Sequence, residues 1–301
     1  MRDENLKKKS VCPACSNGEA KFAGKKNGHS IFYCRRCLTL YSSNDAEDAP
    51  PAFDYEDYYE GHDNSTPEFA ARRLDEIVKT FEPFRQNNRL LDVGCGAGSM
   101  LEAGLKNNWQ AEGVEVSKSG VDYLHSKGFK FFFGTLQEAK FPDNHFDVIT
   151  AVEILEHIPA PQGLLEEIAR ILRSGGLFFA TTPHSKGISA RLLGTRWSTI
   201  APPEHIHLFS TKGLKLLLEK SGFKQVKIST QGVNPFEIIH VLRNGDSTNS
   251  SGEKTFDRNQ TGFQLNAYLS ESPSKKLIKN SVNSLLSLTR LGDSLKIWAQ
   301  K

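Results

Sequence analysis

Hydrophobic positions along the middle of the chain alternate between two spacings. Short apolar runs that suit buried strands lie at 89–94, 110–117, 129–135, 146–152 and 177–183. Between them, three segments repeat their apolar residues every three or four positions, which is typical of amphipathic helices; these are 97–109, 118–128 and 161–176. Strands that alternate with helices in this way predict an α/β fold, with a parallel sheet covered by helices on both faces.

Further elements are expected on either side of this alternation. Helical spacing appears at 67–84 before it, and again at 209–222 and 275–291 after it. Strands are expected at 223–230 and at the end of the chain, 292–300. The stretch 244–262 is polar and rich in Gly and Ser, so we expect a mobile loop there.

Composition narrows the class of protein without naming a function. The 301 residues are 38% hydrophobic and 24% charged, as in ordinary globular proteins. A net charge of +3 is too small to argue for nucleic acid or membrane as a partner. No apolar run is long enough for a membrane helix, and the first ten residues lack a signal-peptide core. We therefore expect a cytoplasmic, reducing location and cysteines without disulfides.

Four of the five cysteines form two C-x2-C pairs near the start of the chain. Cys12 and Cys15 are separated by eighteen residues from Cys34 and Cys37, a spacing typical of structural zinc sites. The segment between the pairs reads as a hairpin that turns at Asn27-Gly28. We therefore predict a zinc-ribbon-like module at 1–41 and a polar connector at 42–66. The alternative is four reduced cysteines without metal.

A glycine-rich turn follows the first strand of the alternating region. "LLDVGCGAGSM" places Gly94, Gly96 and Gly98 between a strand and a helix, where backbone N–H groups can approach a ligand closely. Glu115 ends the next strand, at the distance from the turn where nucleotide-binding folds hold a ribose. Asp92, two residues before the first glycine, would repel a pyrophosphate, but it suits the cationic amino group of a methionine moiety.

These motifs resemble the class I S-adenosylmethionine-dependent methyltransferases over residues 67–232. The resemblance is carried, in this order, by "LLDVGCGAGSM", "GVEVS", "FPDNHFDVITAVEILEHI", "LRSGGLFFATTP" and "PPEHIHLFSTKGLKLLLEKSGF". It implies a Rossmann-like sheet of seven strands whose last strand is antiparallel, and a methyltransferase domain at 67–301. An insertion at 233–292 would then be a lid over the acceptor pocket.

The resemblance also implies a set of residues that bind S-adenosylmethionine. Near the methionine end these are Asp92 and the glycines of the turn, while Glu115 would hold the ribose. The full implied set is Arg73, Asp92, Gly94, Gly96, Gly98, Glu115, Thr135, Leu136 and Val152. Arg73 would bind the methionine carboxylate, and its alternative reading is a solvent-exposed helix charge.

The strand at 146–152 runs into "EILEH", which carries the candidate catalytic residues. Glu153, Glu156 and His157 stand at i, i+3 and i+4, so they would share a face if the chain turned helical. E-x-x-E-H resembles the metal motif of ubiquinone-pathway O-methyltransferases and small-RNA 2′-O-methyltransferases. The further histidine would be His205, with His207 as the alternate. Three roles stay open: binding of magnesium or another divalent ion, a metal-free histidine base, and a structural role.

The sequence therefore predicts a methyltransferase that acts on an oxygen atom of a small molecule or glycan precursor. Two alternatives are a sugar C-methyltransferase, and an RNA or protein methyltransferase whose locally basic N-terminal module grips its substrate. A binding module with a vestigial pocket is the third.

Overall fold

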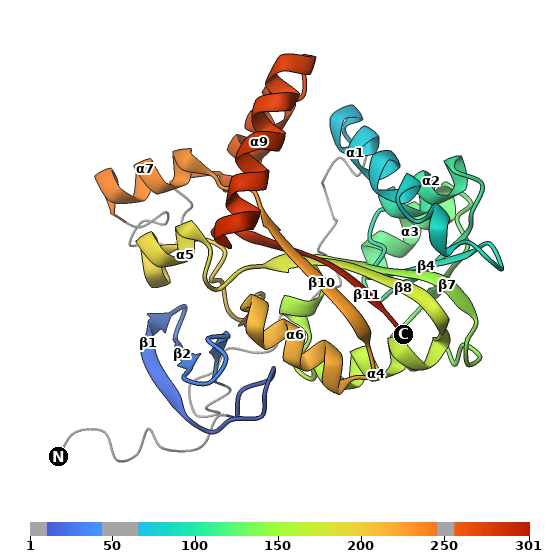
Figure 1. The fold of residues 1–301 in the computed structure, drawn as a ribbon, viewed down its shortest axis with the longest axis horizontal. Helices are drawn as coiled ribbons and strands as arrows, with labels where there is room; N and C mark the ends of the chain where they lie inside the picture. The colour runs from blue at the N-terminus through green and yellow to red at the C-terminus, as the bar shows by residue number, and fades with distance from the viewer. Residues whose placement is uncertain (1–10, 44–65, 246–255) are drawn as a thin grey trace.

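A computed structural model describes residues 11–43, 66–245 and 256–301, and most of them belong to one α/β unit (Figure 1). Its centre is a seven-stranded sheet. From edge to edge the strands are β10 (Lys224–Gln231), β11 (Ser294–Gln300), β8 (Leu172–Pro183), β7 (Phe146–Val152), β4 (Arg89–Val93), β5 (Gln110–Glu115) and β6 (Phe131–Phe133). β11 is antiparallel to both neighbours and the other pairs are parallel. The predicted fold class is confirmed, including the antiparallel last strand.

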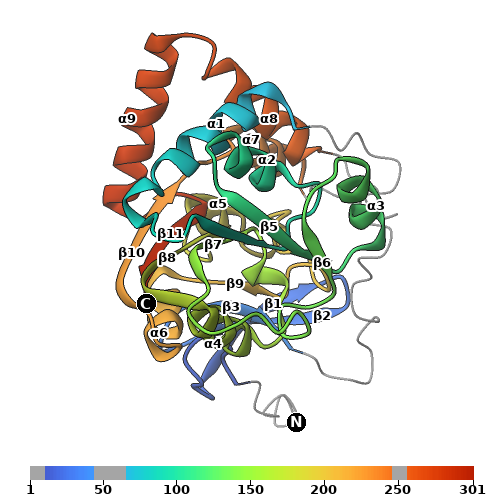
Figure 2. The same cartoon turned by 90° about the vertical axis from the view of Figure 1, so that its right-hand side faces the viewer.

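Helices cover both faces of this sheet (Figure 2). α1 (Glu68–Lys79), the 3-10 helix η2 (Glu82–Phe84), α2 (Ser99–Lys106) and α3 (Lys118–Ser126) lie on one face, and α4 (Pro161–Ile171) and α6 (Thr211–Lys220) lie on the other. Side chains alternate between the faces along a strand. In β8, Phe179 packs into the core under the first group of helices and Phe178 into the core under the second.

Most predicted elements lie where the periodicity placed them, and the exceptions lie around β8 and after β10. The helix predicted at 161–176 ends at Ile171, because β8 begins at Leu172. α7 (Pro235–Asn244) and α5 (Ile188–Leu193) were not expected. The loop prediction for 244–262 is wrong at its end, because α8 (Arg258–Tyr268) begins inside it. Residues 246–255 of that stretch lie outside the described ranges.

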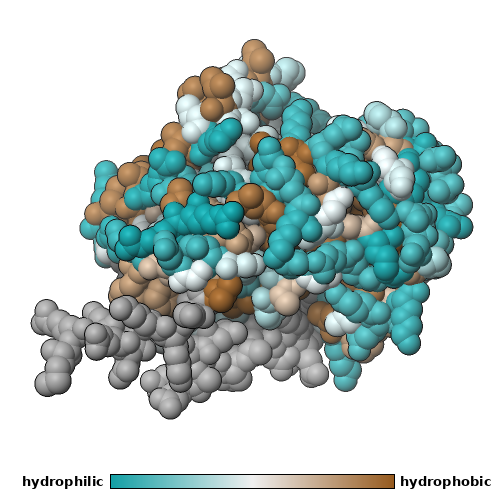
Figure 3. Space-filling view, turned by 60° about the horizontal axis from the view of Figure 1, so that its bottom comes forward, coloured by the Kyte–Doolittle hydropathy of each residue, from teal (hydrophilic) through white to brown (hydrophobic). Residues whose placement is uncertain are grey.

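The described residues between β10 and β11 form the helices α7, α8 and α9 (Pro273–Thr289). In Figure 1, α9 stands away from the sheet. Apolar side chains gather toward this part of the surface in Figure 3, and the exposed ones on α7 and α9 include Phe236, Ile239, Leu242, Leu277, Ile278, Leu285 and Leu288. The lid role of 233–292 stays a prediction. Among the helices described, none has both the length and the apolar character to cross a membrane.

A second, four-stranded sheet holds the cysteine-rich segment. β1 (Ala20–Lys26), β2 (His29–Cys34) and β3 (Leu40–Ser42) are antiparallel, and the predicted hairpin turn is confirmed, with positive φ at Asn27 and Gly28. The fourth strand, β9 (His207–Leu208), comes from the segment that follows β8. The N-terminal segment is therefore hydrogen-bonded to the α/β unit through a shared sheet. The domain boundaries at 41 and 66 stay predictions.

Candidate active site and cysteine cluster

The glycine turn between β4 and α2 has a backbone that requires glycine. The φ angles of Gly94, Gly96 and Gly98 are 68°, 51° and 80°, in the left-handed region that side chains disfavour. A Cβ on Gly94 would lie 2.2 Å from Cδ1 of Ile154. The turn therefore packs directly against the segment that follows β7, and a side chain at position 94 would clash with that segment.

Two buried carboxylates flank this turn. Asp92 accepts a hydrogen bond from Oγ1 of Thr150 at 2.5 Å, and burial raises the pKa of Asp92 to about 7. Glu115 accepts three backbone N–H bonds, from Gly96 at 2.7 Å and from Val116 and Ser117 at 2.8 and 2.7 Å. Glu115 thus fastens the end of β5 to the glycine turn and fixes its own carboxylate beside it.

The other predicted cofactor residues surround the same edge of the sheet. Val152 ends β7, and Leu136 is buried just after β6. The N–H and hydroxyl of Thr135 both bond to Glu138, at 2.8 and 2.7 Å. Arg73 is exposed on α1, within electrostatic range of Glu153. Their contacts with a cofactor stay predictions.

The candidate catalytic residues do not share a helix. The chain forms a 3-10 turn, η3 (Leu155–His157), and Glu153 lies before it with a φ of 55°. The condition for a shared helical face is therefore not met. The fold instead brings Glu156 and His157 to His205, and one ligand atom from each lies within 4.8 Å of the other two. Glu153 is exposed beside this cluster, and the alternate His207 is buried in β9 outside it.

Backbone carbonyls fix both imidazoles of the cluster. Nδ1 of His157 lies 3.0 Å from the Glu204 oxygen, and Nδ1 of His205 lies 2.8 Å from the Thr199 oxygen. A carbonyl only accepts, so each Nδ1 carries the proton and each Nε2 is the acceptor nitrogen. Burial lowers the pKa of both rings, which keeps them neutral near pH 7.

Glu156 supplies the oxygen of the cluster and is fully buried. Its Oε2 accepts a bond from Thr182 at 2.9 Å, and its Oε1 lies 3.9 Å from Nε2 of His157. Oε1 has no hydrogen-bond partner in the part of the chain that the structure describes. Burial, together with the charge of Glu153, raises the pKa of Glu156 well above its usual value. One oxygen and two acceptor nitrogens thus converge on a point that a cation would satisfy.

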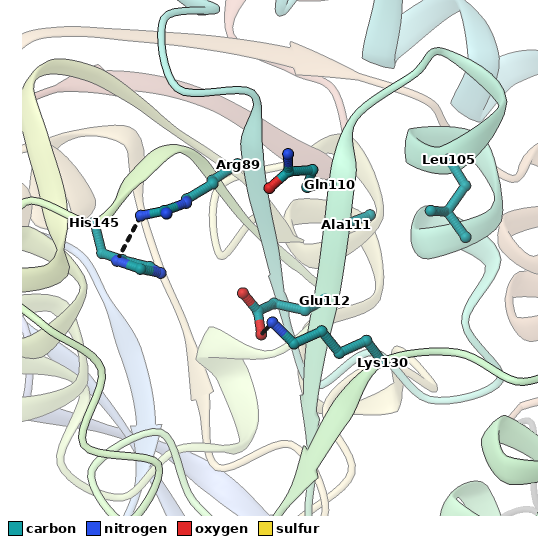
Figure 4. Close-up of a pocket in the computed structure, with 7 residues that line it drawn as sticks. All are labelled: Arg89, Leu105, Gln110, Ala111, Glu112, Lys130 and His145. Carbon is teal, nitrogen blue, oxygen red and sulfur yellow. Dashed lines mark hydrogen bonds and ion pairs between the residues drawn. The ribbon is translucent and has the colours of Figure 1, made fainter.

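A hollow of about 430 Å³ lies elsewhere, at the amino ends of the parallel strands. Figure 4 shows Arg89 directed at His145, with Glu112 facing Lys130 from the neighbouring strand. Open α/β sheets bind ligands at the carboxyl ends of their strands. We therefore do not assign this hollow as the binding site of a cofactor or substrate.

The four predicted cysteines converge, with their sulfur atoms all within 4.8 Å of one another. Sγ of Cys12 lies 3.5 Å from Sγ of Cys37, and Sγ of Cys15 lies 3.4 Å from that of Cys34. A tetrahedron with zinc–sulfur bonds of about 2.3 Å has sulfur atoms about 3.8 Å apart. The cluster fits a tetrahedral ion after a shift of a few tenths of an ångström.

A family model described as a methyltransferase domain matches residues 66–228, more than half of the chain. The chain belongs to this family. Among curated relatives, 27-O-demethylrifamycin SV methyltransferase of Amycolatopsis mediterranei (strain S699) is 30% identical over 145 residues, which cover 44% of this chain and 53% of the relative. Ubiquinone biosynthesis O-methyltransferase of Aromatoleum aromaticum is 26% identical over 174 residues, 54% of this chain and 74% of the relative. The chain thus spans about half the length of several curated relatives that it matches.

Solved structures show the same fold. A SAM-dependent methyltransferase from Archaeoglobus fulgidus aligns with a TM-score of 0.50 at 18% identity, covering 82% of this chain and 98% of that one. Phosphoethanolamine N-methyltransferase 2 of Haemonchus contortus, solved with S-adenosyl-L-methionine, aligns with a TM-score of 0.52 at 15% identity, covering 93% and 70%.

The sequence did not reveal the residues that orient the cluster. Thr182 contacts Glu156 through its hydroxyl, and Thr199 and Glu204 act through their backbone oxygens. Every residue type has a backbone oxygen, so the sequence cannot indicate the contacts of Thr199 and Glu204. Of the three residues, only Thr182 could have been suspected, because its hydroxyl lies at the carboxyl end of a predicted strand.

Proposed function

We propose that this protein transfers the methyl group of S-adenosylmethionine to an oxygen atom of a small-molecule acceptor, with a divalent ion at Glu156, His157 and His205. The observation that carries the proposal is the convergence of these three residues beside the glycine turn. Ile154, which contacts Gly94, precedes Glu156 by two residues, so cofactor turn and cluster are neighbours.

The glycine turn fits the methyl donor. It offers three glycines that carry no side chain, a buried Asp92 for the amino group, and Glu115 at the end of the neighbouring strand. S-adenosylmethionine, when bound, supplies an activated methyl group on a sulfonium leaving group. The task left to the protein is to hold acceptor and donor in line and to exclude water.

The cluster fits a divalent cation because its buried oxygen lacks a partner among the described residues and its two rings present acceptor nitrogens. Mixed oxygen and imidazole donors suit magnesium less well than manganese, iron or zinc. Such an ion, when bound, lowers the pKa of an acceptor hydroxyl. Burial keeps both rings neutral, and the carbonyls of Glu204 and Thr199 accept from the two Nδ1–H groups.

A metal-free general base is the second candidate, and the lowered pKa values of His157 and His205 favour it. A neutral imidazole with an acceptor Nε2 can remove a proton from an acceptor hydroxyl. Dependence of turnover on a divalent ion separates the two candidates.

The acceptor class is proposed from the relatives. Their names specify O-methylation of a rifamycin and of a ubiquinone precursor, which supports a small molecule over a macromolecule. The other two predictions, methylation of a glycan precursor and C-methylation of a sugar, are tested with the same panel of acceptors. Lys26, one of the basic residues of the N-terminal segment, donates a hydrogen bond to the Trp197 oxygen. This positive charge is therefore engaged within the protein, which argues against RNA as the substrate.

The test is transfer of a labelled methyl group to a panel of phenols, quinols, macrolactams and sugar nucleotides, before and after chelation and re-addition of Mn²⁺. Loss of turnover on chelation of the zinc-loaded protein, its return with Mn²⁺, and a loss of about 100-fold or more in His205→Ala are expected. His125→Ala, an exposed change on α3, is the matched control. Full turnover in the chelated protein would reject the metal and favour the histidine base.

A further inference from the structure

The loop between η4 (Gly194–Arg196) and β9 orients both imidazoles of the cluster. Its Thr199 oxygen accepts from His205, and its Glu204 oxygen accepts from His157. The N–H of Ile206 donates to the Glu156 backbone oxygen at 3.0 Å, so the loop also contacts η3 directly. The direction of each ring therefore depends on where this loop holds its carbonyls.

The tip of the N-terminal hairpin binds this same loop. Nζ of Lys26 donates to the Trp197 oxygen at 2.8 Å, and Nδ2 of Asn27 donates to the Pro202 oxygen, also at 2.8 Å. These two acceptors lie on either side of Thr199 in the chain. The hairpin thus fixes the loop at both ends of the turn that carries the Thr199 oxygen.

The N-terminal sheet holds the rest of the loop through backbone pairing and burial. Tyr41 pairs with His207, and the N–H of Ser42 donates to the Ile206 oxygen at 2.9 Å. A shared apolar core contains Ile31 and Leu40 from the N-terminal sheet, with Trp197, Ile200 and Leu208 from the loop and β9. Figure 2 shows this sheet lying along one side of the α/β unit. A sheet that shares a core with a loop restricts the positions of that loop.

We infer that the cysteine module is a working part of the active site, in which Lys26 and Asn27 are positioning residues for His157 and His205. They hold the loop whose carbonyls select the Nδ1–H tautomer and direct both Nε2 atoms toward Glu156. This role rests on the proposed function of the cluster, and it gives the module a task other than gripping a macromolecule.

The test uses the full, zinc-loaded chain with the double variant Lys26→Met/Asn27→Gly. Methionine keeps the apolar stem of the lysine, and glycine keeps the positive φ of position 27 while removing the amide. Lys25→Met changes an exposed neighbour on the same strand. Asn108→Gly makes the same exchange at a φ of 61°, just before β5 in the seven-stranded sheet. These two variants are the matched controls.

Two readouts report ring orientation rather than general stability. Nitrogen-15 shifts of the imidazoles give the tautomer of each ring, and titration with Mn²⁺ gives the affinity of the cluster. The double variant is expected to show mixed tautomers at His157 and His205 and about tenfold weaker Mn²⁺ binding, with unchanged affinity for S-adenosylhomocysteine. Both controls should match the parent protein in all three measurements.

Unchanged tautomers in the double variant would overturn the inference. An equal loss of affinity for S-adenosylhomocysteine and for Mn²⁺ would also overturn it, because it would show general loosening of the fold. The tautomer measurement needs no turnover. A parent protein that transfers no methyl group would therefore refute the proposed function, but it would not test the positioning role of Lys26 and Asn27.

Discussion

Replacing Glu156 by glutamine should make the metal-free cluster more stable while removing its ability to bind a cation. The Glu156 carboxyl is fully buried, and its Oε1 has no hydrogen-bond partner within the described residues. A residue retained at a cost in stability is the pattern expected of a functional site. The exchange therefore separates a structural role of Glu156 from a functional one.

The size of the effect follows from the contacts of the carboxyl group. A buried polar group without a partner costs about 1–3 kcal/mol. In Glu156→Gln the amide oxygen can keep the bond from Thr182, and the amide nitrogen would replace Oε1, which lies 3.9 Å from the acceptor Nε2 of His157. The free energy of unfolding should therefore rise by about 1–3 kcal/mol in the absence of a divalent ion at the cluster.

The gain should depend on pH in a defined direction. The pKa of Glu156 is raised in the folded protein by burial and then by the charge of Glu153. Above the unfolded pKa, the unfolded chain releases the proton that the folded chain keeps, so the stability of the parent protein falls as pH rises. Glutamine does not titrate. The difference in unfolding free energy between variant and parent should therefore be larger at pH 7 than at pH 4.

The assay is urea unfolding of zinc-loaded protein at both pH values, with Glu102→Gln, an exposed change on α2, as the control. The control should stay within about 0.5 kcal/mol of the parent. A Glu156→Gln variant that is less stable than the parent at pH 7 would refute the reasoning. It would show that the carboxylate is satisfied in the folded protein and contributes to its structure.

Three further changes test the cofactor turn and the cysteine cluster. Affinity for S-adenosylhomocysteine, measured by calorimetry, should fall about tenfold from pH 8 to pH 6, because Asp92, with a pKa of about 7, takes up a proton. In Asp92→Asn the affinity should be weak at both pH values. Gly94→Ala should abolish this binding because its Cβ meets Ile154, whereas Gly128→Ala, also at positive φ, should retain it. Cys34→Ser should lose the zinc measured by mass spectrometry, and Cys95→Ala should keep it; equal zinc in both would contradict the four-cysteine site.

Long periodic segments were predictable because burial on a sheet determines them. In α4 the buried residues repeat at the helical spacing, and in β8 residues 177–183 form one continuous buried run, so the sequence carries both patterns directly. The convergence of the two cysteine pairs was equally predictable, since C-x2-C pairs at this spacing are typical of zinc sites, whose ligands lie close together.

The rest depends on contacts that no local pattern records. β3 and β9 are three and two residues long, and their pairing joins segments more than 160 residues apart. The 3-10 turn at Leu155–His157 depends on the neighbouring loop, whose Ile206 bonds to the Glu156 backbone oxygen. α8 lacks a marked apolar face and begins in a stretch of polar composition, so periodicity could not distinguish it from a loop.

The most direct test of the proposed function is anomalous diffraction from crystals of the zinc-loaded protein grown with Mn²⁺ and S-adenosylhomocysteine. The account predicts a manganese peak bound by Oε1 of Glu156 and Nε2 of His157 and His205, with the nucleoside against Gly94 and Gly96. A nucleoside bound at this turn with no manganese at the three side chains would contradict the metal-assisted mechanism, and a nucleoside bound elsewhere would contradict the site itself.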